Sequence, residues 1–231
     1  MTNRRDFLKT GMIAAAAVAA PHPQSIANSF NGEVKRYKRL GRTNLKISDI
    51  SFGTSRLRSG EEYLIHHALD RGINYFDSAE GYTRGQAEKV LGTALKGKRD
   101  KAYLVSKTIL GRDTRQSEMM TRLENSLKSL QTDYIDVYMN HAVNDVEVVA
   151  NPEWISFIEK AKAQGKVRFT GISGHGGYLV DCINYALDQD MIDIMLTAYN
   201  FGQDPKFYEG LTRRLDWIAT QDALPKTITR A

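Results

Sequence analysis

Four side chains capable of proton chemistry follow short apolar segments of the chain: Asp77, Tyr82, Lys107 and His141. A tyrosine with an ordinary pKa of about 10 is a poor acid at neutral pH. A neighbouring ammonium group favours the phenolate and lowers that pKa, and an aspartate keeps the ammonium charged and oriented. A histidine can donate a hydrogen bond to a carbonyl oxygen. Together, the four groups would protonate an oxyanion while a hydride arrives at the carbon.

Each of these side chains, taken alone, also has an ordinary structural explanation. An aspartate at the end of a strand often caps the segment that follows, and a single tyrosine or lysine is usually a surface residue. The four form a site only if the fold brings them together, so the elements that position them decide the matter.

Short β-type segments and amphipathic helical segments alternate from about residue 37. The predicted strands cover residues 47–53, 74–77, 103–107, 135–140, 167–172 and 192–199, and stripes of apolar residues at helical spacing lie between them. Strands that alternate with helices form βαβ units and a parallel sheet. The strand ends recur about every 30 residues, and no G-x-G-x-x-G loop follows the first strand, which favours a (β/α) barrel over a doubly wound sheet.

Polar side chains stand where these predicted strands end. Asp77, Lys107, His141 and Ser173 each end or follow a strand, and Tyr82 lies in the loop after Asp77. In a barrel the functional groups collect at the C-terminal ends of the strands. The topology therefore predicts that an acid, a lysine, a histidine and a tyrosine converge on one mouth of the barrel.

The composition of the 231 residues excludes several classes of protein. Apolar residues make up 42% and charged residues 26%, as in an ordinary globular protein. The single cysteine, Cys182, excludes an internal disulfide and a cysteine-based zinc cluster. The net charge of +5 comes with no basic block interleaved with aromatics, so we expect no nucleic-acid partner. No apolar run reaches the ~18 residues of a membrane span.

The first thirty residues predict an export signal separate from the fold. Residues 2–9 read T-N-R-R-D-F-L-K, and a run of small residues and two prolines follow. This order is typical of a signal peptide, and the arginine pair followed by F-L-K resembles a twin-arginine (Tat) leader. We expect a leader and linker over residues 1–30, the Tat translocation machinery as a partner, a periplasmic or other extracytoplasmic location, and no stable membrane insertion. An organellar presequence or a plain helix is the alternative.

Several motifs, in the right order, resemble the aldo/keto reductase family. Residues 37–54 resemble the opening hairpin and first barrel strand, and G-I-N-Y-F-D-S-A-E-G-Y at residues 72–82 resembles the D-T-A-x-x-Y signature. Residues 88–96 are similar to the helix that follows. Residues 126–141 resemble the segment L-x-x-L-x-x-D-Y-I-D-x-Y-x-x-H. The resemblance extends from about residue 37 to residue 201.

The resemblance implies a (β/α)8 barrel of the TIM type and the reduction of a carbonyl, in an aldehyde or ketone, to an alcohol by NADPH. It makes Tyr82 the general acid, with Lys107 lowering its pKa, Asp77 as the partner of Lys107, and His141 orienting the substrate carbonyl. The resemblance also implies a set of cofactor-binding residues, with one serine at the nicotinamide amide and one tyrosine stacked on its ring: Ser173, Tyr199, Gly53 and Thr54.

The sequence departs from the family pattern at three places. Gly174 follows Ser173 where the family usually has asparagine, and Leu196 stands where many members have glutamine. Too few residues follow Tyr199 for two further βα units, and residues 222–231 fit neither a strand nor an amphipathic helix. We therefore expect an incomplete barrel of about six βα units over residues 36–231, with its C-terminal part missing.

Two other functions remain as alternatives. A truncated barrel could be an inactive pseudoenzyme or an interaction subunit that keeps the fold without turnover. A metal hydrolase using His141, His175 and Asp77 is disfavoured, because no H-x-H pair follows the first strand. We therefore expect no metal, and the leading hypothesis is an NADPH-dependent oxidoreductase.

Overall fold

A parallel sheet of six strands is the central feature of the fold. The computed structural model describes residues 32–198 and 217–231, so the predicted leader and Tyr199 lie outside the described residues. A hairpin comes first, with β1 (Tyr37–Arg39) antiparallel to β2 (Lys46–Ser48). Neighbouring strands of the sheet are parallel and follow chain order. They are β3 (Phe52–Gly53), β4 (Tyr75–Asp77), β5 (Tyr103–Thr108), β6 (Ile135–Asn140), β7 (Val167–Gly174) and β8 (Ile194–Thr197).

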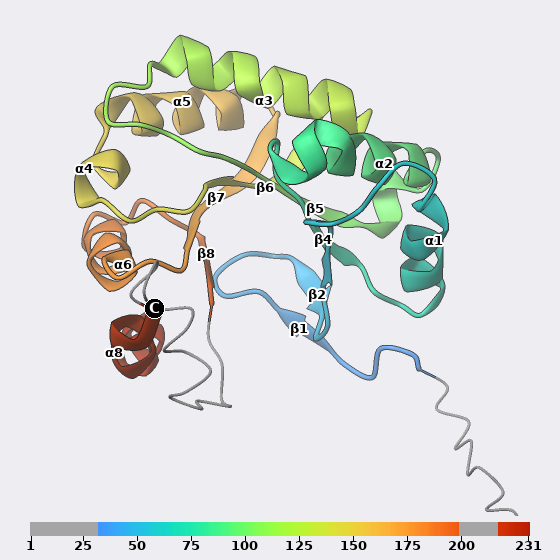
Figure 1. The fold of residues 1–231 in the computed structure, drawn as a ribbon, viewed down its shortest axis with the longest axis horizontal. Coiled ribbons are helices and arrows are strands. Elements are labelled where there is room, and N and C mark those ends of the chain that lie inside the picture. The colour runs from blue at the N-terminus through green and yellow to red at the C-terminus, as the bar shows by residue number, and fades with distance from the viewer. Residues whose placement is uncertain (1–31, 199–216) are drawn as a thin grey trace, which may run out of the picture. The chain divides into compact units, whose positions relative to one another are not determined.

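Helices occupy the connections between these strands and cover the outer face of the curled sheet (Figure 1). The alternation of strand and helix confirms the parallel βα organisation expected from the sequence. The helices are α1 (Glu62–Asp70), α2 (Gln86–Ala94), α3 (Gln116–Leu130), α4 (Val146–Val149), α5 (Pro152–Ala163), α6 (Leu179–Asp188) and α8 (Trp217–Arg230), with the 3-10 turns η2 (Tyr82–Gly85) and η3 (Arg99–Lys101).

Apolar side chains pack on both faces of the sheet. Successive side chains of a strand point to opposite faces, so Leu104 and Tyr138 pack against the helices while Val105 and Val137 face the interior. Leu45, in the loop between β1 and β2, belongs to the same interior cluster and is fully buried. The loop of the hairpin therefore places the apolar side chain of Leu45 against the interior face of the curled sheet.

Local sequence signals explain several element boundaries. The start of α5 follows from its first residues, since the Asn151 side chain accepts a hydrogen bond of 2.9 Å from the Glu153 N–H and Pro152 opens the first turn. Gly92 lets α2 approach α3 closely, because a Cβ atom there would lie 2.6 Å from the carbonyl carbon of Leu130. This close contact sets the position of α2, which follows the loop that carries Tyr82.

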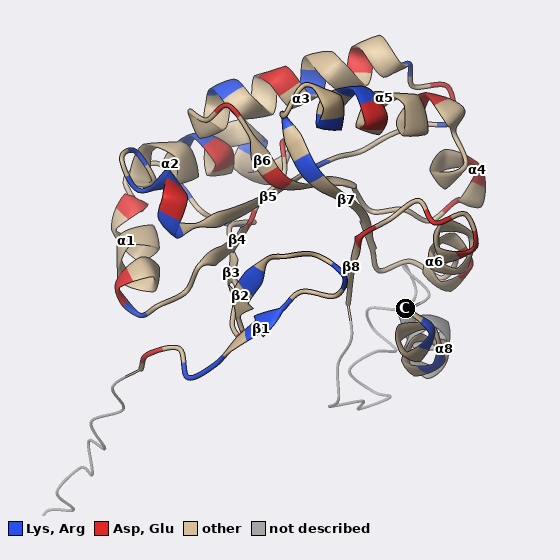
Figure 2. Cartoon of the chain, turned by 180° about the vertical axis from the view of Figure 1, so that it is seen from behind, with Lys and Arg blue, Asp and Glu red and all other residues tan. Residues whose placement is uncertain are grey.

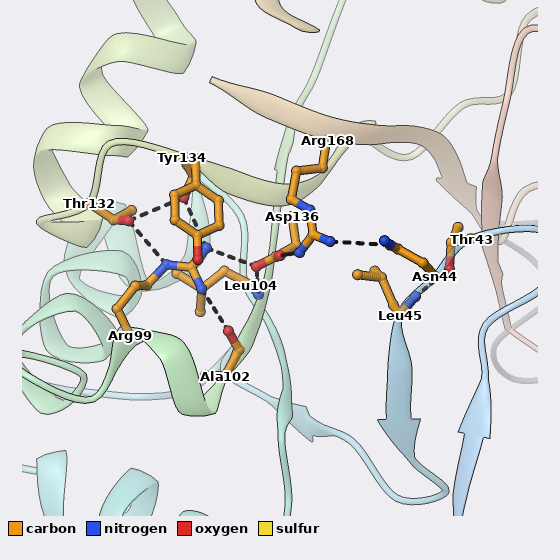
Figure 3. Close-up of polar contacts among 10 residues, drawn as sticks. All are labelled: Thr43, Asn44, Leu45, Arg99, Ala102, Leu104, Thr132, Tyr134, Asp136 and Arg168. Carbon is orange, nitrogen blue, oxygen red and sulfur yellow. Dashed lines mark hydrogen bonds and ion pairs between the residues drawn. The ribbon is translucent and has the colours of Figure 1, made fainter. Parts of the chain in front are cut away.

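A buried ion-pair network ties the N-terminal ends of the strands together (Figure 3). Asp136, the second residue of β6, is 1% exposed and accepts hydrogen bonds from Arg99 at 2.8 Å, from the Leu104 N–H at 2.9 Å and from Arg168 at 2.5 Å. Arg168 also bonds Asn44 of the hairpin at 3.1 Å. The network thus joins η3, β5, β6, β7 and the hairpin.

The structure differs from the sequence prediction at residues 47–53. This segment is divided between β2 and β3, because the chain turns at residues 49–51, where Ser48 donates a hydrogen bond of 2.6 Å to the carbonyl of Ile50. Ile50 itself is 60% exposed. Only the last part of the expected strand therefore joins the sheet.

The prediction for residues 222–231 is wrong, because these residues lie almost entirely within α8. A helix was not predicted here because the apolar stripe of residues 222–231 is short and Pro225 lies inside this segment. Leu224 is nevertheless fully buried in the apolar cluster around α6, and Arg230 bonds Asn184 at 2.9 Å and pairs with Asp188. These tertiary contacts outweigh the weak local preference.

Charges on the outer helices are mixed in sign. Figure 2 shows both acidic and basic residues on α3 and on α5, so neither helix carries charges of a single sign. In the part of the chain that the structure describes, every helix is too short or too polar to cross a membrane.

Candidate active site

The C-terminal ends of β4, β5 and β6 bring the four predicted acid–base residues together. Asp77 is the last residue of β4, Lys107 lies near the end of β5, and His141 follows β6 directly. The three strands are neighbours in the sheet, with Asp77 paired to Val105 and Lys107 two residues further along β5. Tyr82 reaches the same place from η2, in the loop after β4.

Lys107 is the centre of this group. Its side chain is fully buried, and its ammonium donates hydrogen bonds to Asp77 Oδ1 at 2.7 Å, to the Ser78 carbonyl at 2.6 Å and to the Tyr82 hydroxyl at 3.3 Å. These three acceptors match the three protons of an ammonium. The ammonium also lies 4.8 Å from the centre of the Tyr82 ring. Lys107 therefore links the aspartate and the tyrosine directly.

His141 completes the group from the other side of Tyr82. The two rings meet edge to face, with centroids 5.6 Å apart and planes at 79°. Both rings line a pocket of about 260 Å³, together with Lys107. The remaining lining residues are Ala142, Ser173, Gly174, His175, Leu196, Thr197 and Ala198.

Burial acts against both charges of the buried pair. It lowers the pKa of the Lys107 ammonium, and the Asp77 carboxylate opposes that shift. It raises the pKa of Asp77, and Lys107 opposes that shift in turn. Each charge therefore depends on its partner, because an unpaired charge in this position would be neutralised.

Burial also sets the protonation of the two aromatic groups. It raises the pKa of Tyr82 to about 12, with the Asp77 carboxylate adding to the effect, whereas we expected Lys107 to lower this pKa. The half-buried position of the ring outweighs the ammonium, so Tyr82 holds its proton at neutral pH. Burial, and then the charges of Lys107 and His175, lower the pKa of His141 to about 4. His141 is therefore a neutral hydrogen-bonding group.

Strained backbone follows both aromatic groups. Thr83 and Arg84, directly after Tyr82, have φ values of 47° and 57°, and Ala142, directly after His141, has a φ of 58°. Residues with a side chain rarely adopt this left-handed region, and such strain concentrates at functional sites. The Thr83 hydroxyl donates a hydrogen bond of 2.8 Å to the Leu57 carbonyl, which holds the loop in place.

The predicted cofactor-binding residues have different environments. Ser173 is buried beside the pocket, and its hydroxyl has no hydrogen-bond partner among the residues that the structure describes. Gly53 pairs with Asp77 at the end of β3, with open space where a Cβ would be. Thr54 is fully buried, and its hydroxyl bonds the Asp77 carbonyl at 3.0 Å and Ser78 at 2.9 Å. Thr54 thus joins β3 to β4, and its contact with a cofactor stays a prediction, as does that of Tyr199.

The structure shows the surroundings of Gly174 and Leu196, two residues at which the sequence departs from the family pattern. Gly174 has no room for an asparagine side chain, because a Cβ atom there would lie 2.7 Å from the Val143 carbonyl oxygen and 2.7 Å from Leu179. Leu196 lines the pocket and is 40% exposed. Among the described residues, no group of three or more histidine, cysteine or acidic side chains could hold a metal ion.

A buried acid behind the site was not predicted from the sequence. Glu88, on α2, is 2% exposed and accepts a hydrogen bond of 2.5 Å from the hydroxyl of Ser106, the residue before Lys107. The sequence signal for this burial is the position of Glu88 among Ala87, Val90 and Leu91, on a helix whose apolar face must be buried.

Comparison with known proteins agrees with this geometry. A model of the aldo/keto reductase family matches residues 49–202. Among curated proteins, the aldo-keto reductase YhdN of Bacillus subtilis is 38% identical over 118 residues, which are 47% of this chain and 35% of YhdN. The methylglyoxal reductase YeaE of Escherichia coli is 37% identical over 116 residues, 50% of this chain and 39% of YeaE. The chain thus spans less than half the length of these two relatives.

Solved structures show the same similarity. The holo form of the aldo-keto reductase AKR11C1 from Bacillus halodurans is 27% identical, with a TM-score of 0.63 over 78% of this chain and 63% of that one. An aldo/keto reductase from Klebsiella pneumoniae in complex with NADP and acetate is 31% identical, with a TM-score of 0.57 over 67% of this chain and 54% of that one. The six parallel strands are those of a (β/α)8-type fold, and the chain belongs to the aldo/keto reductase family.

Proposed function

We propose that this protein reduces a small aldehyde or ketone to the alcohol with NADPH. One observation carries the proposal: the buried Lys107 ammonium joins the Asp77 carboxylate to the Tyr82 hydroxyl, with His141 against the same tyrosine. A buried lysine that donates to both an acid and a phenol is suited to stabilise a phenolate. A pocket of about 260 Å³ lies beside these groups, lined by Tyr82, Lys107 and His141.

The residues present fit a nicotinamide cofactor. The Ser173 hydroxyl is buried beside the pocket and is unpartnered among the described residues, so it is free to bond a carboxamide. The Klebsiella pneumoniae relatives were solved with NADP and with NADPH. NADPH would supply the hydride, and Ser173 would hold the nicotinamide amide.

The protein's own residues would manage the proton. Tyr82, with a pKa of about 12, keeps its proton at neutral pH and donates it to the carbonyl oxygen as negative charge develops there. Lys107 then stabilises the phenolate that remains, and Asp77 keeps Lys107 charged and in place. His141, neutral because its pKa is about 4, donates a hydrogen bond to the same carbonyl oxygen and orients it.

Two measurements on the full chain test this function. NADPH fluorescence is titrated with the protein, and NADPH consumption is followed with a panel of small aldehydes and ketones. We expect saturable binding and turnover, and we expect Tyr82→Phe to bind NADPH as before but to reduce carbonyls at least about 10²-fold more slowly. Folded protein that neither binds NADPH nor consumes it would contradict the proposal.

We also propose that the protein is exported in the folded state through the Tat pathway to the periplasm or another extracytoplasmic compartment. The motif R-R-D-F-L-K, followed by a run of small residues, supports this location. Residues 1–30 fused to a folded reporter should carry it out of the cytoplasm, and replacement of Arg4 and Arg5 by lysine should stop the export. A reporter that stays inside with either leader would overturn the proposal.

A further inference from the structure

Glu88 is a buried acid that has no direct role in the proposed acid–base chemistry. It lies on α2 with 2% of its surface exposed, between the sheet and α3. The Ser106 hydroxyl of β5 donates a hydrogen bond to it at 2.5 Å. Burial raises the pKa of Glu88. Burying a carboxylate is costly, so its charge needs a compensating partner.

Strand geometry places one such partner, Lys107, on the far side of β5. Ser106 and Lys107 are consecutive, so Ser106 points toward the helices while Lys107 points toward the interior. Glu88 and Lys107 thus flank one strand, and each acts on the other: Glu88 raises the pKa of Lys107, and Lys107 lowers the pKa of Glu88.

The other groups around this pair come from several elements. Asp77 of β4 and Tyr82 of η2 contact Lys107 directly, and the ring of His141, which follows β6, packs against Tyr82. Glu80, in the loop after β4, raises the pKa of Glu88 but pairs with Arg122 of α3. Asp77 and Glu88 are therefore the two carboxylates that favour the charged form of Lys107, one from each side of the strand.

We propose that Glu88 is a positioning residue that acts through β5 and keeps Lys107 charged in its buried site. Its consequence for catalysis rests on the proposed function, since a charged Lys107 is what stabilises the Tyr82 phenolate. A purely structural role would be a hydrogen bond that fastens α2 to β5. Glutamine separates the two roles, because it can still accept the Ser106 hydrogen bond but carries no charge.

The test is a direct titration of Lys107 in the full chain. Lysine side chains are labelled with ¹³C at Cε, Lys107→Met identifies the Lys107 signal, and its chemical shift is followed against pH by NMR. We expect Glu88→Gln to lower the pKa of Lys107 by about one unit, the size expected for a partly screened charge across one strand. The matched control is Glu80→Gln, which removes a carboxylate that does not act on Lys107 and should leave its pKa unchanged.

Two further readouts keep the test decisive. An unchanged pKa of Lys107 in folded Glu88→Gln would overturn the inference. If Glu88→Gln does not fold, the wild-type protein decides. Labelling of glutamate carboxyls with ¹³C gives the pH at which Glu88 titrates, separately from Asp77, and the Lys107 signal should show a step at that pH. No step at that pH would overturn the inference.

Activity separates this inference from the proposed function. If the protein reduces carbonyls, Glu88→Gln should move the alkaline limit of kcat to lower pH and leave the binding of NADPH as it was. If the wild-type protein reduces nothing, the proposed function fails, and the titration of Lys107 still decides whether Glu88 holds its charge.

Discussion

Two aspartates at opposite ends of the same sheet, Asp136 and Asp77, are paired with cations in different ways. At the N-terminal ends of the strands, both oxygens of Asp136 are bonded: Oδ1 to Arg168, and Oδ2 to Arg99 and the Leu104 N–H. At the C-terminal ends, Asp77 uses Oδ1 for Lys107, and its Oδ2 has no partner within the described ranges, 32–198 and 217–231.

The difference separates a structural network from a chemical one. A buried polar network in which every group is satisfied holds its elements in one arrangement. The network at Asp77 is incomplete, and its lysine shares a weaker bond of 3.3 Å with a phenol that can give up a proton. This agrees with the division in barrels, where the N-terminal face carries stability and the C-terminal face carries catalysis.

The largest effect should come from the phenol at the C-terminal end. Tyr82→Phe removes one oxygen and leaves the ring against His141, so we expect kcat/KM for carbonyl reduction to fall about 10²–10⁴-fold, in the range of general acid catalysis. The melting temperature and the Kd for NADPH should stay near those of the wild type. A variant with more than a tenth of the wild-type rate would show that Tyr82 is not the acid.

The matching change at the N-terminal end should affect folding instead. Asp136→Ala leaves Arg99, Arg168 and the Leu104 N–H without their shared acceptor, and we expect a loss of about 2–3 kcal/mol in the free energy of unfolding. The loss is below that of a fully buried pair because Arg168 is 36% exposed. Urea denaturation measures it, with the exposed Asp133→Ala as the control.

If the comparison holds, Asp136→Ala keeps its kcat at a temperature where it is still folded. A large fall in kcat there would mean that the two ends of the sheet are not independent.

Acid should weaken the C-terminal end through His141. The ordinary pKa of histidine is 6.5, and burial lowers it to about 4 here, so the unfolded chain binds a proton first as the pH falls. Stability from the neutral ring is complete above pH 6.5 and is lost as the pH drops through about 4. Since the ring is partly exposed, we expect this loss to be about 1–2 kcal/mol.

Denaturation curves between pH 7 and pH 4 measure this dependence. The variant His141→Gln should show a flatter curve than the wild type, because glutamine does not titrate. Equal slopes for the two proteins would mean that the pKa of His141 is the same in the folded and the unfolded chain.

The sequence predicted best what depends on local pattern. β6 lies where its apolar run predicted a strand, and the four acid–base residues were found because each stands at or shortly after a strand end. What was missed depends on contacts between distant residues. Glu88 could not be told from a surface acid until α2 was placed on β5, and α8 is held by contacts with α6 despite Pro225.

The smallest effect concerns the backbone beside His141. Ala142 has a φ of 58°, in a region that glycine adopts freely and alanine does not. Ala142→Gly should therefore stabilise the folded protein by up to about 1 kcal/mol in urea denaturation. Gln131, with a φ of 52° at the end of α3, is a control far from the pocket, and Gln131→Gly should give a similar gain.

If the strain at Ala142 serves catalysis by fixing His141, only Ala142→Gly should lower kcat, by a few-fold, because relief of strain gives the histidine more than one position. A gain in stability with kcat unchanged would show that the strain is incidental, and the division between the two ends of the sheet would then rest on the polar networks alone.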